Sequence, residues 1–310
     1  MDNSPVKLST APVLGNHDCT NDDIGVYHPG PTAASAFTAA LAPNADIAVC
    51  IRMPPYTPAG SVAPMTTPST IDTARALLAD ASHIEVFTGA GMSADSGIAT
   101  YRDAQTGLWE NVDPQDMASI DAWHDDPDTM FAWYLWRAHL AQQAEPNAGH
   151  AAVAKSPKTT VTTQNIDNLH ERAGSKGVVH LHGSLFDFRC SLCDEPYTGP
   201  INLPEEPVAE ITPPACPVCG GSVRPGVVWF GEALPEGEWK EAERRMRTAD
   251  ALVIVGTSGV VYPAAGLPLM AHARDIPIIE VTPMRTDLSH LADVVIEDTA
   301  AAALPTLLGQ

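Results

Sequence analysis

Four of the six cysteines form two C-x-x-C pairs, a pattern whose most direct chemistry is metal binding. The first pair is Cys190 and Cys193, the second is Cys216 and Cys219, and 22 residues separate the two pairs. Two such pairs at this spacing suit one tetrahedral zinc ion. Because all four ligands are thiolates, no position is left open for water, and the zinc is expected to be structural. Two disulfides or free thiols are the alternative, and a reducing compartment disfavours the disulfides.

A second pattern is the Gly-x-Gly turn from Gly89 to Gly91, which follows the strand-like run 84–88. Glycine lets a backbone approach a pyrophosphate closely, and N–H groups at a helix start face negative charge. The turn therefore predicts a dinucleotide cradle, with Ala94 in the third fingerprint position. A dehydrogenase would end a further strand in an acidic ribose ligand about 20 residues later. Residues 107–111 do not read as that strand, so the nucleotide is expected to be held differently.

Three more polar stretches follow strand-like runs. They are TQNIDNLH at 163–170, LHGS at 181–184 and VGTS at 255–258. Amides, hydroxyls, a carboxylate and an imidazole at the carboxyl ends of strands lie where α/β proteins form their sites.

Together with GAGMSADSGIATYRDAQTGLW at 89–109 and the cysteine pairs, these stretches resemble the signature of the sirtuins. The resemblance runs from about residue 70 to 308 and is closest to the class III members that remove succinyl and malonyl groups. It implies a Rossmann-like domain with an inserted zinc-ribbon module. The implied activity is cleavage of NAD as a co-substrate to remove acyl groups from protein lysine, with one structural Zn²⁺.

The resemblance implies catalytic roles for His182 and Asn165. An imidazole titrates near neutral pH, so His182 is expected to act as the base that takes a proton from a ribose hydroxyl. In the implied reaction the acyl oxygen attacks the nicotinamide ribose carbon and nicotinamide leaves. Water then releases free lysine and O-acyl-ADP-ribose. The alternative for a lone histidine is a structural role, and the Leu-His-Gly-Ser context argues against it.

The resemblance also implies a cofactor shell, with Asn165 and Asp167 around nicotinamide and Gln164 near the ribose. The alternative for Asn165 and Asp167 is a turn or helix cap, and the alternative for Arg102 is a surface salt bridge. The implied cofactor residues are Gly89, Ala90, Gly91, Ser93, Ala94, Gly97, Ile98, Tyr101, Arg102, Trp109, Gln164, Asn165, Ile166, Asp167, Gly256, Thr257, Ser258, Thr282 and Ala300.

Two positions depart from the family pattern. Ala99 stands where a proline is usual, and Thr282-Pro283 stands where an asparagine usually contacts the adenosine ribose. Threonine offers one hydroxyl and no amide, and proline lacks an N–H. Weaker contacts on the adenosine side of NAD are therefore expected.

The enzyme is expected to favour acidic acyl groups, such as succinyl and malonyl, while retaining some deacetylase activity. Tyr134 and Arg137 lie three residues apart on a predicted helix and can clamp a carboxylate at the far end of an acyl chain. Ala94 and Thr100 match the same class of sirtuins. The alternative is an amphipathic helix with an exposed arginine. The implied edge for the substrate peptide is formed by Val228, Phe230, Gly231 and Glu232.

The elements that must position these residues alternate along the chain. Apolar strands between helices predict a parallel sheet covered on both faces, an α/β fold. Strands are expected at 84–88, 158–163, 178–182, 227–230, 251–255, 278–281 and 293–296, and helices at 69–82, 115–145, 239–247, after Pro263 and around 304–308.

The domain organisation follows from composition. Residues 1–68 carry ten prolines and are expected to be an accessory, partly disordered extension, with an autoinhibitory or targeting arm as the alternative. Residues 69–310 are expected to form the catalytic domain. Its Rossmann-like part comprises 69–110, 155–185 and 227–310, with a helical insertion at 111–154 and the zinc module at 186–226.

The charge and hydropathy exclude several classes. The formal net charge is −21, so direct nucleic-acid binding is disfavoured. The acidic surface serves solubility or salt adaptation, or attracts basic protein tails. With no apolar run of ~18 residues and no signal peptide, a cytoplasmic monomer that does not bind membranes is expected. Mono-ADP-ribosyl transfer on the same fold and a non-catalytic NAD-binding module remain the alternative functions.

Overall fold

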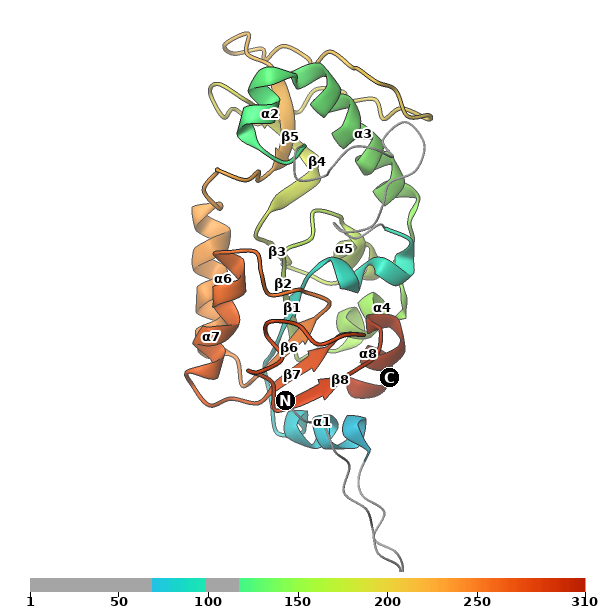
Figure 1. Ribbon diagram of the computed structural model, residues 1–310, viewed down its shortest axis with the longest axis vertical. Helices are drawn as coiled ribbons and strands as arrows, with labels where there is room; N and C mark the ends of the chain where they lie inside the picture. Colours follow the sequence, from blue (N-terminus) through green and yellow to red (C-terminus); the bar gives the residue numbers. More distant parts are fainter. Residues whose placement is uncertain (1–68, 99–116, 310) are drawn as a thin grey trace, which may run out of the picture. The chain divides into compact units, whose positions relative to one another are not determined.

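The computed structural model describes residues 69–98 and 117–309, and a parallel sheet of six strands lies at the centre of this part (Figure 1). The strand order is β3-β2-β1-β6-β7-β8. Numbered by their order in the chain, these strands run 3-2-1-4-5-6, the doubly wound arrangement. The predicted α/β fold is therefore confirmed. The strands are β1 (Ile84–Thr88), β2 (Thr159–Thr163), β3 (Val179–His180), β6 (Ala251–Val255), β7 (Ile278–Val281) and β8 (Val294–Ile296).

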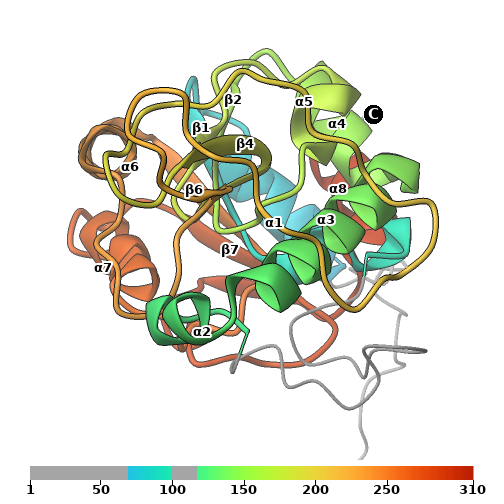
Figure 2. The ribbon, with the colours of Figure 1, turned by 90° about the horizontal axis from the view of Figure 1, so that it is seen from above.

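The two faces of the sheet are covered because successive side chains of a strand point to opposite sides. Val86 and Val253 pack with α1 (Thr70–Leu78), α4 (Ala148–Lys155) and α8 (Ala300–Leu307). On the other face, residues such as Phe87 and Ile254 pack with α6 and α7, which lie side by side in Figures 1 and 2. Helix α6 is Glu236–Thr248 and α7 is Leu267–His272, after the 3₁₀ turn Ala264–Gly266.

A second core is built by α2 (Ile120–Asp125), α3 (Pro127–Gln143) and the antiparallel pair β4 (Gly183–Cys190) and β5 (Val223–Val227). Its largest buried side chains include Trp133, Tyr134 and Trp229. The single helix expected at 115–145 is divided in two. Asp126 caps the second helix, accepting a hydrogen bond of 3.1 Å from the Thr129 N–H, and Pro127 occupies its first turn.

The strand expected at 227–230 differs from the observed one. Strand β5 ends at Val227, and the next residues pair with other segments. The Val228 N–H donates to the His182 carbonyl at 2.9 Å, and the Phe230 N–H donates to the Ala118 carbonyl at 2.8 Å. The segment therefore connects the second core to the end of β3. Strand β3 itself is shorter than the predicted run 178–182.

Helix α4 belongs to the sheet core. Its Ala152 and Val153 pack in the same cluster as Leu304 of α8, and a Cβ at Gly149 would lie 2.7 Å from the Ala300 carbonyl oxygen. The helical insertion predicted at 111–154 therefore includes a helix that packs on the sheet. The bounds of the insertion stay a prediction.

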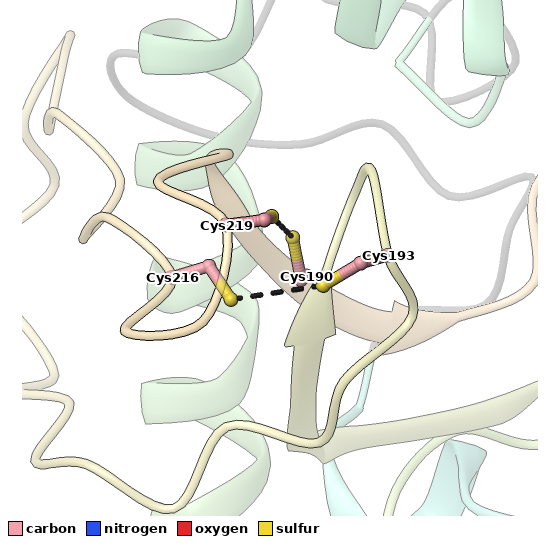
Figure 3. Close-up of side chains that lie close together, drawn as sticks. All are labelled: Cys190, Cys193, Cys216 and Cys219. Carbon is pink, nitrogen blue, oxygen red and sulfur yellow. Dashed lines mark hydrogen bonds between the residues drawn. The ribbon is translucent and has the colours of Figure 1, made fainter.

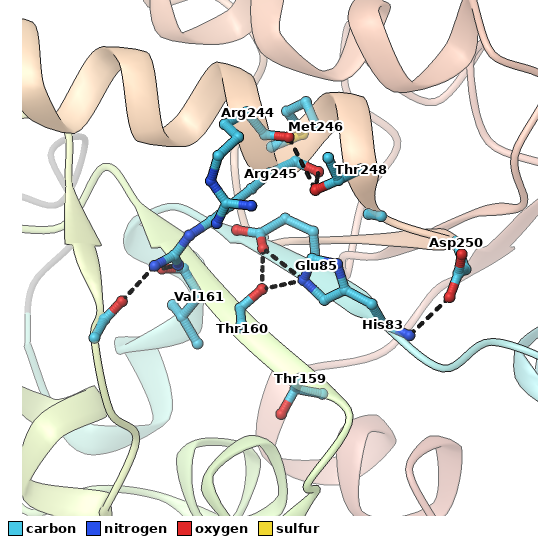
Figure 4. Close-up of polar contacts among 12 residues, drawn as sticks. His83, Glu85, Thr159, Thr160, Val161, Arg244, Arg245, Met246, Thr248 and Asp250 are labelled. Carbon is cyan, nitrogen blue, oxygen red and sulfur yellow. Dashed lines mark hydrogen bonds and ion pairs between the residues drawn. The ribbon is translucent and has the colours of Figure 1, made fainter.

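A buried polar cluster lies at the amino ends of β1 and β2, away from the predicted site (Figure 4). Glu85 is fully buried and accepts a hydrogen bond from the Thr160 hydroxyl, which also contacts His83 Nε2 at 2.7 Å. Burial raises the pKa of Glu85, although its hydrogen bonds and the positive charge of Arg245 act to lower it. Arg245 donates to the Val161 carbonyl at 2.8 Å and so ties α6 to β2.

Several predictions fall outside the described residues. The extension 1–68 and the division at residue 68 stay predictions, and so do the roles of Thr100, Tyr101, Arg102 and Trp109. Within the described ranges, no helix is both long and apolar enough to cross a membrane.

Candidate active site and metal centre

Two glycine turns meet where the chain changes direction in the sheet, between β1 and β6. The Gly89 and Gly91 N–H groups donate to the Val255 and Gly256 carbonyls at 2.9 and 2.8 Å. A Cβ at Gly91 would lie 2.7 Å from Gly256 Cα, and Gly256 has φ of +57°. The backbones of the two turns are therefore in contact, and no side chain fits between them.

The N–H groups of the first two glycines have partners within the chain, and their role in binding NAD stays a prediction. They bond the end of β6 and Gly256 after it, and the segment from Ala90 to Ser96 forms two 3₁₀ turns, Ala90–Met92 and Ala94–Ser96. The glycines form a floor of bare backbone at the switch point of the sheet, which is where a doubly wound fold binds a dinucleotide. A floor without side chains beside the Thr257 hydroxyl fits NAD.

The 163–170 motif joins this floor. Gln164 Nε2 donates to Thr257 Oγ1 at 2.8 Å, so the motif after β2 contacts the turn after β6. Asn165 and Asp167 are buried and share Ser93. Ser93 Oγ donates to Asp167 Oδ2 at 2.9 Å and accepts from Asn165 Nδ2 at 3.2 Å. Burial raises the pKa of Asp167, opposed by hydrogen bonds from the Leu169 N–H and Ser93.

His182 lies half-buried just after β3. Its Nδ1 is 3.0 Å from the Gln164 carbonyl oxygen. A carbonyl only accepts, so Nδ1 carries the proton and Nε2 keeps its lone pair. Burial lowers the pKa of His182, although the Gln164 carbonyl opposes the shift. The ring is thus neutral at pH 7 and can accept a proton at Nε2.

His180 is unsuited to that task. Its Nδ1 contacts the Asn165 carbonyl at 2.9 Å, and its Nε2 contacts Glu171 Oε1 at 2.8 Å. Burial lowers the pKa of His180, but the hydrogen bond and charge of Glu171 outweigh burial and raise it. Both ring nitrogens are engaged, so His180 holds the Asn165 carbonyl in place. Glu171 belongs to the short helix α5 (Leu169–Ala173).

The predicted acyl clamp lies in the second core. Tyr134 is 1% exposed, whereas Arg137 is half-buried. The Arg137 guanidinium stacks 4.7 Å from the Trp133 ring centre and 5.8 Å from that of Tyr134. No carboxylate in the described part of the chain pairs with Arg137. The role of the pair as an acyl clamp stays a prediction.

In the predicted peptide edge, the Glu232 side chain is bound by residues of the chain itself. Glu232 forms an ion pair with Arg224 and accepts from the Trp229 N–H at 2.8 Å. Arg224 in turn stacks 3.3 Å from the Trp229 ring centre. Phe230 is 51% exposed and Gly231 has φ of +90°. Sequence reasoning missed Arg224, because no local motif marks it.

The four predicted metal ligands converge (Figure 3). Their Sγ atoms all lie within 4.8 Å of one another, with Cys190 3.4 Å from Cys219 and Cys193 3.8 Å from Cys216. Tetrahedral zinc with Zn–S bonds of about 2.3 Å would separate its sulfurs by about 3.8 Å. The Leu192 and Val218 N–H groups also donate to Cys190 and Cys216 Sγ. The group fits one zinc ion.

The remaining predicted cofactor residues have mixed environments. Thr282 is buried, and its hydroxyl donates to the Met284 carbonyl at 2.7 Å. Its single donor is therefore used locally. Ile98 and Ile166 pack against the second core, Ala90 and Ser258 are half-buried, Ala94 and Gly97 are exposed, and Ala300 begins α8.

Comparison with known proteins gives concordant matches. The model of the Sir2 family matches residues 89–263. An NAD-dependent protein deacylase 2 of Corynebacterium efficiens is 62% identical over 234 residues, which cover 74% of this chain and 92% of that protein. An NAD-dependent protein deacylase Sir2 of Mycolicibacterium smegmatis is 52% identical, covering 73% and 95%. A solved Sir2 homologue in complex with NAD has a TM-score of 0.70 at 38% identity, covering 76% of this chain and 92% of that one.

Proposed function

The chain belongs to the Sir2 family, and on that premise we propose that it is an NAD-dependent protein-lysine deacylase that prefers acidic acyl groups. The first part follows from relatives named NAD-dependent protein deacylases at 52 and 62% identity. The acyl preference rests on the Tyr134–Arg137 pair. The alternative of mono-ADP-ribosyl transfer has no feature in its favour.

The observation that carries the proposal is the fixed tautomer of His182. NAD supplies the nicotinamide–ribose bond that breaks and the ribose that receives the acyl group. His182 Nε2 is the proton acceptor, and the Gln164 carbonyl holds the ring in that state. Asn165 and Asp167, joined through Ser93, provide amide and carboxyl groups beside the turn. Gln164 and Thr257 border the floor of bare backbone on the ribose side.

The proposed zinc site takes no part in the reaction itself. Four thiolate ligands leave no coordination site for a substrate, so zinc holds the loop between β4 and β5 in place. This loop follows directly from the end of β4, whose beginning is next to His182. We expect zinc to support the active site through the fold.

An acidic acyl chain is supported by charge. A half-buried guanidinium on two aromatic rings, with no carboxylate beside it in the described part, suits a terminal carboxylate. Val228, Phe230 and Gly231 are proposed to bind the peptide through their backbone, and Glu232 to maintain that edge.

The setting of the enzyme is also proposed. Acylated lysines of other proteins are its substrates, and a net charge of −21 favours basic segments over nucleic acid. We propose that the enzyme works in the cytoplasm, because two C-x-x-C pairs for metal are typical of a reducing compartment. We also propose that it is a monomer.

The test is a screen of acetyl-, malonyl-, succinyl- and glutaryl-lysine peptides with NAD, measuring nicotinamide and the acylated product. Loss of the base in His182→Ala should lower the rate by about 100-fold or more. The exposed His290→Ala is the matched control and should retain activity. ADP-ribose retained on a protein side chain would indicate transfer instead, and no nicotinamide release would contradict an enzyme.

A further inference from the structure

Two buried histidines outside the proposed chemistry lie behind the 164–165 peptide. His150 of α4 is 0% exposed and His170 of α5 is 1% exposed. Their rings meet edge to face with centres 4.8 Å apart. Burial lowers the pKa of His150 to about 4 and that of His170 well below its ordinary value. Both rings are therefore neutral at pH 7.

Their hydrogen bonds fix the same tautomer in both rings, with the proton on Nε2. His150 Nδ1 accepts from the Asn147 N–H at 3.3 Å, so the proton of this ring is on Nε2. Thr88 Oγ1 donates to Thr163 Oγ1 at 2.7 Å, so at 3.2 Å His170 Nε2 is the donor to Thr88. The proton of His170 is thus on Nε2, and its Nδ1 is an acceptor. The two nitrogens left without a hydrogen bond, His150 Nε2 and His170 Nδ1, are a donor and an acceptor.

The chain of contacts ends at the proposed catalytic groups. Thr163 Oγ1, which accepts from Thr88, also accepts from the Asn165 N–H at 3.0 Å. That hydrogen bond fixes the turn that contains Gln164. The Gln164 carbonyl is the group that holds the proton of His182 on Nδ1.

We propose that His170, backed by His150, is a positioning residue that acts through the Thr88 and Thr163 hydroxyls. It directs the Thr88 hydroxyl to Thr163, Thr163 fixes the Gln164–Asn165 turn, and the turn fixes both Asn165 and the tautomer of His182. Neutral rings are required, because a protonated His170 would carry a second N–H in a site with no acceptor for it. The proposal rests on the proposed deacylase function only in its kinetic part.

The variants follow from the contacts. His170→Phe keeps the ring volume and loses the donor, whereas His170→Gln keeps a donor near Nε2. Thr163→Val removes the acceptor of the Asn165 N–H, whereas Thr163→Ser keeps it. Thr159→Val is the matched control, because Thr159 is in the same strand and its hydroxyl bonds the Val153 carbonyl at 2.7 Å, away from the turn.

Two measurements test the proposal. The first is the kcat for deacylation, expected to fall about three- to tenfold in His170→Phe and Thr163→Val, the factor of one net hydrogen bond. KM for the peptide should stay within about twofold, and the glutamine and serine variants should recover the rate. The second is ¹⁵N NMR of the His182 ring without NAD. The Nδ1–H tautomer should dominate in the wild type and in Thr159→Val, and lose population in His170→Phe and Thr163→Val.

The outcomes separate the two proposals. An inactive wild type with the expected NMR pattern contradicts the deacylase and leaves the positioning chain intact. An active wild type whose His170→Phe and Thr163→Val variants match Thr159→Val in kcat and in the His182 tautomer overturns the positioning role. Such variants would then have lost only folding stability.

Discussion

Replacing Arg137 by methionine tests the acyl preference, because this change removes the guanidinium and keeps much of the side-chain volume. A carboxylate bound by the arginine fork would accept two charge-assisted hydrogen bonds, each contributing about 1.5–3 kcal/mol. Since the guanidinium is half-buried, partial hydration reduces the sum, and we expect a loss of about 3 kcal/mol. That loss corresponds to roughly a 100-fold fall in kcat/KM for a succinyl-lysine peptide.

The same variant should barely affect an acetyl-lysine peptide, which has no carboxylate. Methionine still loses the stacking of Arg137 on Trp133, a contribution of about 0.5–1 kcal/mol that both substrates share. We therefore expect deacetylation to fall by about fivefold or less, and Arg137→Lys to lie between the two for succinyl-lysine because it keeps the charge without the fork. The assay is nicotinamide release from matched peptides. Equal losses for both peptides in Arg137→Met would refute the carboxylate clamp.

The other two predictions concern metal and pH. Removing zinc by chelation should unfold the loops of residues 186–226 and abolish activity until zinc is restored. The unfolding is measured as faster amide hydrogen exchange in these loops. Full activity without metal would show that the four cysteines maintain the fold without zinc. His150 has a pKa of about 4 in the folded protein against about 6.5 when unfolded, so the unfolded state binds more protons between these values and stability should fall as pH drops from 6.5 to 4, by about 3 kcal/mol in total. His170 beside it acts in the same direction, and so does Glu171, whose pKa is lowered from 4.5, whereas the raised pKa of His180 acts in the opposite direction but above pH 6.5. Denaturation curves of His150→Gln against wild type therefore isolate the effect, and an unchanged pH slope would contradict it.

The sheet could be predicted where burial is uniform. The strands at 84–88, 251–255 and 278–281 have the predicted bounds, because every residue in them is buried and the apolar run ends where the strand ends. The cysteine cluster could be predicted equally well, since the two C-x-x-C pairs identify the four ligands and their spacing suits one metal ion. In both cases a local pattern contains the whole physical cause.

The second core was harder to predict because its elements form through contacts with residues far away in the sequence. Strand β5 contains Pro225 and Gly226, which disfavour a strand, yet it pairs with β4 across an irregular register between Ser184 and Phe188. Helix α4 begins with a capping box formed by Asn147 and His150, where a glutamate or glutamine is the usual signal. Neither feature follows from hydrophobic periodicity.

The histidines show most clearly which properties of the site cannot be predicted from the sequence. His182 could be assigned from its Leu-His-Gly-Ser context, but nothing local distinguishes the protonation of His150, His170 and His180. The pKa of His180 is raised because Glu171 lies 2.8 Å away, and the pKa of His150 is lowered because its side chain is completely buried. One side-chain type thus supplies two kinds of support: His180, whose pKa is raised, contacts the Asn165 carbonyl, and the neutral His170 and His150 act through the hydroxyls that hold the Gln164–Asn165 peptide. Because that peptide carries the carbonyl that orients His182, the proton-accepting nitrogen depends on residues from α4, α5 and three strands.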